Sequence, residues 1–133
     1  LVDPRSPFRI LVVEDEPVIR ELVRSMLDDG PVEVETAGSG PEGLRRAKES
    51  RFDLVLLDVV LPGMDGLTVC RMLKADPSTA SVPLYMLTAK TRRADLEAAL
   101  AAGANGYIHK PFRGAELMEL VERYLDALRQ SVR

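Results

Sequence analysis

The sequence has one cysteine, only short hydrophobic runs and no excess of positive charge. The lone Cys70 excludes an internal disulfide and favours a reducing, cytoplasmic setting. The apolar runs end after four or five residues, whereas a membrane-spanning helix needs about 20, so we expect no membrane contact. A net charge of −3 gives no reason to expect direct nucleic acid binding by this chain.

The length of 133 residues fits one domain with one hydrophobic core. We expect an N-terminal tail at residues 1–8, the domain at 9–128 and a short C-terminal tail at 129–133. Prolines, a serine and charged residues make up much of the first segment, which is typical of a tail. A chain that begins with Leu1 rather than methionine favours a piece of a longer protein over a stand-alone one.

Apolar runs of strand length alternate with segments of helical period along the chain. Strands are predicted at 10–13, 32–36, 54–57, 84–87 and 107–108. Helices are predicted at 18–27, 96–103 and 117–128. Two more should begin at the capping box of Ser39 and Glu42 and at the cap residue Asp65. Strands separated by helices predict an α/β fold with a parallel sheet and helices on both faces.

The apolar pattern also predicts the order of the strands. The runs 10–13, 54–57 and 84–87 are continuously apolar, so both of their faces should be covered and they should be central. The run 32–36 alternates between apolar and polar residues and the run 107–108 is short, so these two should form the edges. We therefore expect a flavodoxin-like (βα)5 three-layer sandwich with strand order 2-1-3-4-5.

Polar residues follow the predicted strands where each strand ends. Glu14 and Asp15 follow the first strand, Asp58 the third, Thr88 the fourth and Lys110 the fifth. Each alone has an ordinary explanation, such as a helix cap or a solvated lysine. Because the carboxyl ends of parallel strands meet at one edge of the sheet, the five together indicate a binding site there.

The chemistry of this set points to phosphoryl transfer. Clustered carboxylates repel one another, and a divalent cation relieves that repulsion. Oxygen ligands without histidine or cysteine favour Mg²⁺ over Zn²⁺. Lys110 suits a phosphoryl oxygen, Thr88 can donate a hydrogen bond, and Asp58 between two cations is a suitable nucleophile. The sequence therefore predicts that Asp58 accepts a phosphoryl group.

Four motifs together resemble the receiver domains of response regulators in two-component signalling, of the chemotaxis-regulator kind. The likeness extends from about Arg9 to Leu128. The motifs are Val-Val-Glu-Asp-Glu-Pro at 12–17, Leu-Leu-Asp-Val-Val-Leu-Pro-Gly-Met-Asp-Gly at 56–66, Leu-Thr-Ala at 87–89 and Tyr-Ile-His-Lys-Pro-Phe at 107–112. The resemblance implies a switch in phosphorelay signalling that takes its phosphoryl group from a histidine kinase, a phosphotransfer protein or a small phosphodonor.

The resemblance also implies a metal site. Asp58 would be the phosphoacceptor, and Asp15 and Asp58 would bind Mg²⁺ directly. The backbone carbonyl of Val60 would be a third ligand, and Glu14 would act on the metal through water. Val60 offers no polar side chain to align an attacking water, so we expect a rather long-lived phosphoryl aspartate.

A second group of implied roles concerns the switch. Thr88 would move to the phosphoryl group, Tyr107 would change rotamer with it, and Lys110 would bind a phosphoryl oxygen. The Lys110–Pro111 peptide bond is expected to be cis, which about 5–6% of X-Pro bonds are. An output face on the fourth helix, fifth strand and fifth helix would include Lys90, Arg92, Arg93, Tyr107 and Arg113. That face could meet an acidic partner or form a homodimer, or it could simply be solvated.

Three other functions compete with this interpretation. A flavodoxin-like cofactor binder needs a Gly/Ser/Thr-rich phosphate loop after the first strand, where this chain has Glu-Asp-Glu-Pro. A hydrolase with an aspartate nucleophile usually carries it after the first strand and needs a substrate cap. Neither fits, so we expect no turnover enzyme. A pseudo-receiver that acts through protein contacts alone stays as the alternative.

Overall fold

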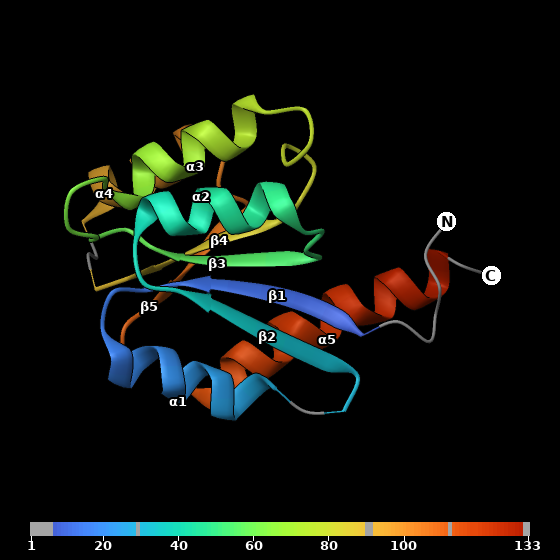
Figure 1. Ribbon diagram of the computed structural model, residues 1–133. Coiled ribbons are helices and arrows are strands. Elements are labelled where there is room, and N and C mark those ends of the chain that lie inside the picture. The colour runs from blue at the N-terminus through green and yellow to red at the C-terminus, as the bar shows by residue number, and fades with distance from the viewer. Residues whose placement is uncertain (1–6, 29, 90–91, 112, 132–133) are drawn as a thin grey trace.

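The computed structural model describes residues 7–28, 30–89, 92–111 and 113–131. Strands and helices alternate along the whole chain (Figure 1). Their order is β1 (Phe8–Val13), α1 (Pro17–Leu27), β2 (Val32–Ala37), α2 (Gly40–Glu49), β3 (Leu54–Asp58), α3 (Gly66–Ala75), β4 (Leu84–Thr88), α4 (Arg93–Ala101), β5 (Gly106–His109) and α5 (Gly114–Ser131). Within these residues no helix combines the length and the apolar character needed to cross a membrane.

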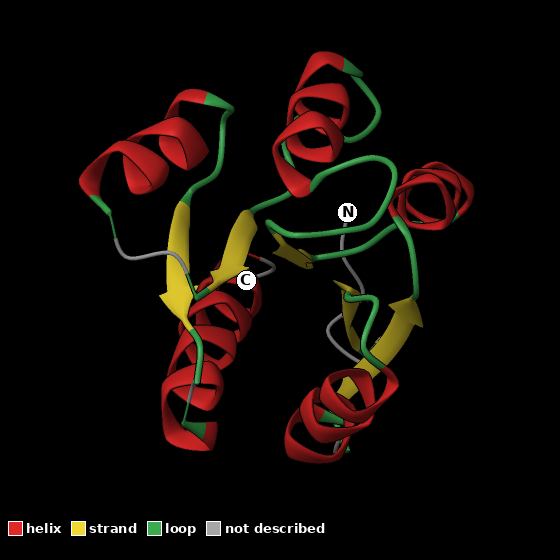
Figure 2. Cartoon of the chain, turned by 90° about the vertical axis from the view of Figure 1, so that its left-hand side faces the viewer, coloured by secondary structure: helices red, strands yellow, loops and turns green. Residues whose placement is uncertain are grey.

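The strands form one parallel sheet in the order β2-β1-β3-β4-β5. Helices α2, α3 and α4 cover one face of this sheet, and α1 and α5 cover the other (Figure 1). This three-layer arrangement confirms the fold class and the strand order that the apolar pattern predicts. The parallel register places the carboxyl ends of all strands at one end of the molecule, which faces the viewer in Figure 2.

Burial on the two faces explains the apolar pattern of each strand. Alternate residues of β1 enter opposite cores: Leu11 packs with α2 and α3, and Ile10 packs with α1 and α5. In β2, Val32 and Val34 are buried while Glu33 between them is exposed, because one face of this edge strand meets solvent.

Helix caps form where the sequence predicts them. The Ser39 hydroxyl accepts a hydrogen bond from the Glu42 amide at 3.3 Å, and the Glu42 carboxylate accepts one from the Gly38 amide at 2.8 Å. Asp65 caps α3 through the Thr68 amide at 2.9 Å. The bonds to the Glu42 and Thr68 amides satisfy donors that the first turns of α2 and α3 leave without partners inside the helix, and the Gly38 amide lies just before the cap of α2.

The structure differs from the sequence prediction at both tails. Phe8, assigned to the N-terminal tail, begins β1, and only 1% of its surface is exposed. Arg9 hides this start in the sequence, because its charge interrupts the apolar run. In the structure its guanidinium lies 4.7 Å from the centre of the Phe52 ring and pairs with Glu35. At the other end, α5 continues through Ser131, so residues 129–131 are helix and not tail.

Candidate functional site

Three carboxylates meet at the carboxyl end of the sheet. Glu14 and Asp15 follow β1 directly, and Asp58 is the last residue of β3, the neighbouring strand. One oxygen atom from each carboxylate lies within 4.8 Å of the others. The parallel register brings these residues together although more than 40 positions separate Asp15 from Asp58 in the sequence. The structure thus places three oxygen ligands where a cation could bind.

The carboxylates of the site are largely buried and do not form an exposed acidic patch. Glu14 has no exposed surface and Asp58 has 5%, while Asp15 is half-buried. The Val60 amide donates a hydrogen bond to Asp58 Oδ1 at 2.9 Å, and the Val60 side chain is exposed at the rim. Buried carboxylates cost free energy unless a cation or hydrogen bonds compensate them, so this arrangement calls for a positive partner.

Lys110 supplies a positive charge within the chain. Its Nζ donates to Asp58 Oδ2 at 2.8 Å and also to the Glu14 carboxylate. The Lys110–Pro111 peptide bond is cis, and the Lys110 amide donates to the Thr88 carbonyl at 2.7 Å. The end of β5 therefore holds the ammonium group against both buried carboxylates.

Burial and mutual repulsion shift the ionisation of the cluster. Burial, and after it the neighbouring Asp58 carboxylate, raises the pKa of Glu14 from 4.5 to about 7, although Lys110 acts in the opposite direction. Burial by itself would lower the pKa of Lys110, but its hydrogen bonds to Asp58 and Glu14 outweigh this and raise it. Without a metal ion, Glu14 therefore gains a proton near neutral pH while Lys110 stays charged.

We expect the metal-free chain to lose stability between pH 4.5 and pH 7. In this window the native state binds more protons than the unfolded state, because folding raises the pKa of Glu14 from 4.5 to about 7. The free energy of unfolding should fall by up to about 3 kcal/mol as pH rises, and Glu14→Gln should remove most of that slope. Urea unfolding in EDTA at several pH values measures this, and Glu33→Gln is the control because Glu33 is an exposed residue of β2. Equal slopes in Glu14→Gln and wild type would contradict it.

Thr88 lies beside the cluster and Tyr107 lies farther out. Thr88 ends β4 with 3% of its surface exposed, directly after Leu87, which is paired with Asp58 across the sheet. Tyr107 is 37% exposed, and its ring stacks on that of His109 with 5.5 Å between ring centres. The structure thus brings Thr88 to the site, and it leaves Tyr107 partly exposed to solvent on edge strand β5.

The output face is described only in part. Lys90 lies outside the described residues. Arg92, Arg93 and Arg113 are exposed, and Arg93 pairs with Glu97 at 3.0 Å within α4. Between β5 and α5 lies a hollow of about 320 Å³ whose lining includes Tyr107 and His109. A partner for this face stays a prediction.

The sequence analysis did not single out Arg20. Its guanidinium Nη1 donates to the backbone carbonyls of Glu14 at 2.8 Å and Asp15 at 3.0 Å. One signal for it exists in the sequence. The first turn of the helix that follows the acidic residues in the sequence contains an arginine, three positions after Pro17, beside the apolar Val18 and Ile19.

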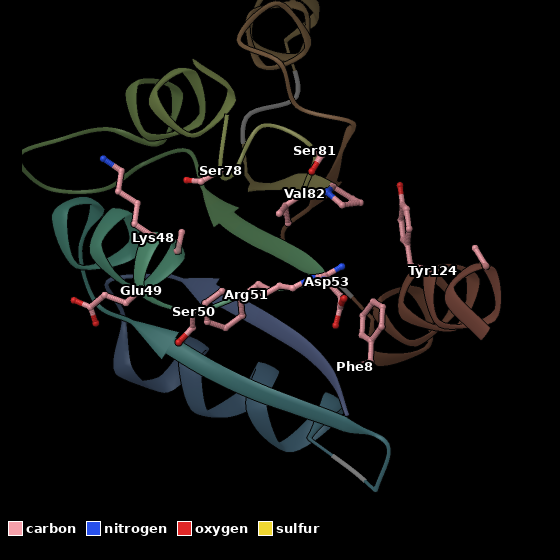
Figure 3. Close-up of a pocket in the computed structure, with 14 residues that line it drawn as sticks. Phe8, Lys48, Glu49, Ser50, Arg51, Asp53, Ser78, Ser81, Val82 and Tyr124 are labelled. Atoms are coloured by element: carbon pink, nitrogen blue, oxygen red, sulfur yellow. The ribbon is translucent and has the colours of Figure 1, made fainter. Parts of the chain in front are cut away.

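A larger hollow lies at the other end of the sheet. About 720 Å³ in volume, it opens at the amino-terminal ends of the strands, where Phe8, Asp53 and Tyr124 contribute to its wall (Figure 3). Lysine and arginine there are balanced by glutamate and aspartate: Lys48, Arg51, Glu49 and Asp53. Because the acidic cluster is at the carboxyl ends of the strands, this hollow is not part of the candidate site.

Comparison with protein families identifies the same region of the chain. Residues 10–122 match the family model described as response regulator receiver domain. The DNA-binding response regulator MtrA of Mycolicibacterium smegmatis is 44% identical over 117 residues, which are 88% of this chain and 50% of that protein. The transcriptional regulatory protein ResD of Bacillus subtilis is 37% identical over 124 residues, 93% of this chain and 50% of that protein. The chain thus spans about half the length of these curated relatives.

Solved structures agree with this match. A chemotaxis protein of Vibrio cholerae superposes with a TM-score of 0.84 at 33% identity, covering 90% of this chain and 99% of that one. The receiver domain of a Pseudomonas aeruginosa sensor histidine kinase superposes with a TM-score of 0.83 at 35% identity, covering 91% and 99%. That receiver domain was solved with a magnesium ion coordinated in its active site cleft.

Proposed function

The chain belongs to the response regulator receiver family, and we propose that it accepts a phosphoryl group on Asp58 in phosphorelay signalling. One observation carries this proposal. The Asp58 carboxylate is almost fully buried, has Lys110 Nζ 2.8 Å from one oxygen, and lies in a cluster with Glu14 and Asp15. A carboxylate placed between an ammonium group and a cation site is suited to attack phosphorus, because both positive charges offset those of the incoming phosphoryl oxygens.

Mg²⁺ fits the donor set of this site. The cluster offers oxygen atoms only, and among the described residues no histidine or cysteine joins it. Asp15, Asp58 and the backbone carbonyl of Val60 would hold the ion, with Glu14 acting through water. When bound, Mg²⁺ neutralises charge on the phosphoryl oxygens.

The residues of the chain share the work of phosphoryl transfer. An Asp58 carboxylate oxygen forms a bond to phosphorus while the bond from phosphorus to the donor nitrogen or oxygen breaks. The leaving atom keeps the electron pair: a histidine nitrogen then takes a proton from solvent, whereas acetate leaves acetyl phosphate as the anion. Lys110 binds a phosphoryl oxygen, and the Thr88 hydroxyl donates to another. We expect water to hydrolyse the phosphoryl aspartate slowly, so the chain acts as a phosphoacceptor and not as a turnover enzyme.

The partners follow from this role. The donor is a histidine kinase or a phosphotransfer protein, and the compartment is the cytoplasm, where a free thiol such as Cys70 stays reduced. Phosphorylation shifts the equilibrium between two conformations of the domain, and Thr88 and Tyr107 carry the change from the site to the output face. That face meets an output domain, another protein or a second copy. MtrA is named as DNA-binding and is twice as long as the matched region, so we assign no nucleic acid contact to the receiver domain itself.

The direct test is incubation with acetyl phosphate and Mg²⁺ followed by intact mass measurement. We expect a gain equal to one phosphoryl group, which is absent when EDTA replaces Mg²⁺. No gain together with no Mg²⁺ binding would overturn the proposal and leave a module that acts by protein contacts alone.

Val60 should control the lifetime of the phosphorylated form. Its exposed side chain stands two residues beyond Asp58 at the rim of the site and has no polar atom to orient water. We expect Val60→Asn to lose its phosphoryl group roughly tenfold faster than wild type, because an amide can align the attacking water. Decay of the phosphorylated mass after removal of the donor measures the rate, and Val60→Ala is the control. Faster decay in wild type than in Val60→Asn would contradict this.

A further inference from the structure

We propose that Arg20 is a positioning residue that orients Glu14 and Asp15 for metal binding. This inference rests on the proposed Mg²⁺ site and deepens it. Arg20 lies in α1, and its Nη1 donates to two consecutive carbonyls, those of Glu14 at 2.8 Å and Asp15 at 3.0 Å. A guanidinium bound to two neighbouring carbonyls fixes the planes of both peptides, and so fixes the direction in which the Asp15 side chain leaves the backbone.

Two side chains bind the backbone of the turn between β1 and α1: Arg20, and Glu14, whose carboxylate accepts a hydrogen bond from the Glu16 amide at 3.3 Å. The Glu14 amide is held by the Ala37 carbonyl at 3.0 Å, but the cap residue Glu16 makes no side-chain bond to the start of α1. The Asp15 carboxylate itself is half-buried in the acidic cluster. The direction of that carboxylate follows from the backbone of Asp15, and Arg20 binds the carbonyls on both sides of the Asp15 Cα.

The Arg20 guanidinium lies against Gly38, where a side chain would occupy the same space. A Cβ atom added to Gly38 would lie 3.1 Å from Arg20 Nη1 and 3.6 Å from Cζ, and its three nearest neighbours all belong to Arg20. Gly38 follows β2, so the guanidinium sits between the ends of the first two strands. The absence of a side chain at this position thus lets Arg20 reach the carbonyls.

Charge and orientation predict opposite effects when Arg20 is removed. Losing a positive charge near a cation site would by itself strengthen Mg²⁺ binding. Losing the orientation of a metal ligand weakens binding, typically by 10- to 100-fold when a supporting contact is deleted. The direction of the change therefore distinguishes a positioning role from a purely electrostatic one.

The test is the Mg²⁺ dissociation constant of the whole chain, measured by calorimetry for wild type, Arg20→Ala and Arg24→Ala. We expect Arg20→Ala to weaken binding about tenfold. Arg24→Ala removes the same charge one turn along α1, where the guanidinium binds the Thr36 hydroxyl, and it should change binding less than twofold. Equal or tighter binding in Arg20→Ala would overturn the inference. A wild-type chain without Mg²⁺ affinity would instead overturn the proposed function on which it rests.

A second variant separates positioning from general damage to the fold. Gly38→Ala requires the guanidinium to shift by a few tenths of an ångström but keeps its charge, and we expect it to weaken Mg²⁺ binding severalfold. In an Arg20→Ala background the same substitution should have no further effect, because its close neighbours are atoms of Arg20. Additive losses in the double variant would overturn the inference, because both substitutions would then act independently of the contact.

Discussion

Replacing Asp58 with asparagine should abolish phosphorylation of the chain. After incubation with Mg²⁺ and acetyl phosphate, wild type should gain the mass of one phosphoryl group and Asp58→Asn should gain none. The amide is nearly isosteric and can still accept the Val60 hydrogen bond, which is 2.9 Å long in the structure. It lacks the negative charge and the nucleophilic oxygen, so the rate should fall by at least about a hundredfold.

A matched control comes from the same connection between β3 and α3. Asp65→Asn carries the identical chemical change on the cap of α3, where asparagine caps about as well as aspartate. We expect this variant to be phosphorylated at the wild-type rate. A mass gain in Asp58→Asn equal to that of Asp65→Asn would show that another residue accepts the phosphoryl group.

Replacing Lys110 with methionine should strongly destabilise the metal-free chain. Methionine keeps most of the volume but leaves Glu14 and Asp58 buried without a positive partner. Removing one member of a buried ion pair costs about 3–5 kcal/mol, and we expect a loss in that range at pH 8 in EDTA. The loss should shrink toward pH 5, because a proton on Glu14, whose pKa is already about 7, then removes one negative charge.

Mg²⁺ should restore part of this stability, since a cation that binds only the native state stabilises it by mass action. Urea unfolding with and without Mg²⁺ measures the recovery. Lys48→Met is the control, because Lys48 is exposed and its pairing with Asp76 at 3.8 Å should contribute less than about 1 kcal/mol. Similar losses in the two variants would mean that Lys110 does not compensate the buried carboxylates.

The sequence alone determined the class of fold and which polar residues lie together at one edge of the sheet. Continuous apolar runs identify β1, β3 and β4 as central strands, and strict alternation identifies β2 as an edge, because each pattern records how many faces of a strand are covered. Once the strands are parallel, a residue that ends a strand must lie at the same end of the sheet as the others. Position along the chain is therefore enough to assemble Glu14, Asp15, Asp58, Thr88 and Lys110.

The tertiary structure decided the burial, the pKa and the contacts of each of these residues. Sequence spacing cannot show that Glu14 is fully buried and that its pKa is about 7, because both depend on neighbours brought from β3 and β5. It does not reveal that Phe8 belongs to β1, because the stacking of Arg9 on Phe52 depends on segments far apart in the chain. The Arg20 contact has the same origin. Periodicity is a local property that a sequence records directly, whereas desolvation and the direction of a side chain arise only after distant segments pack.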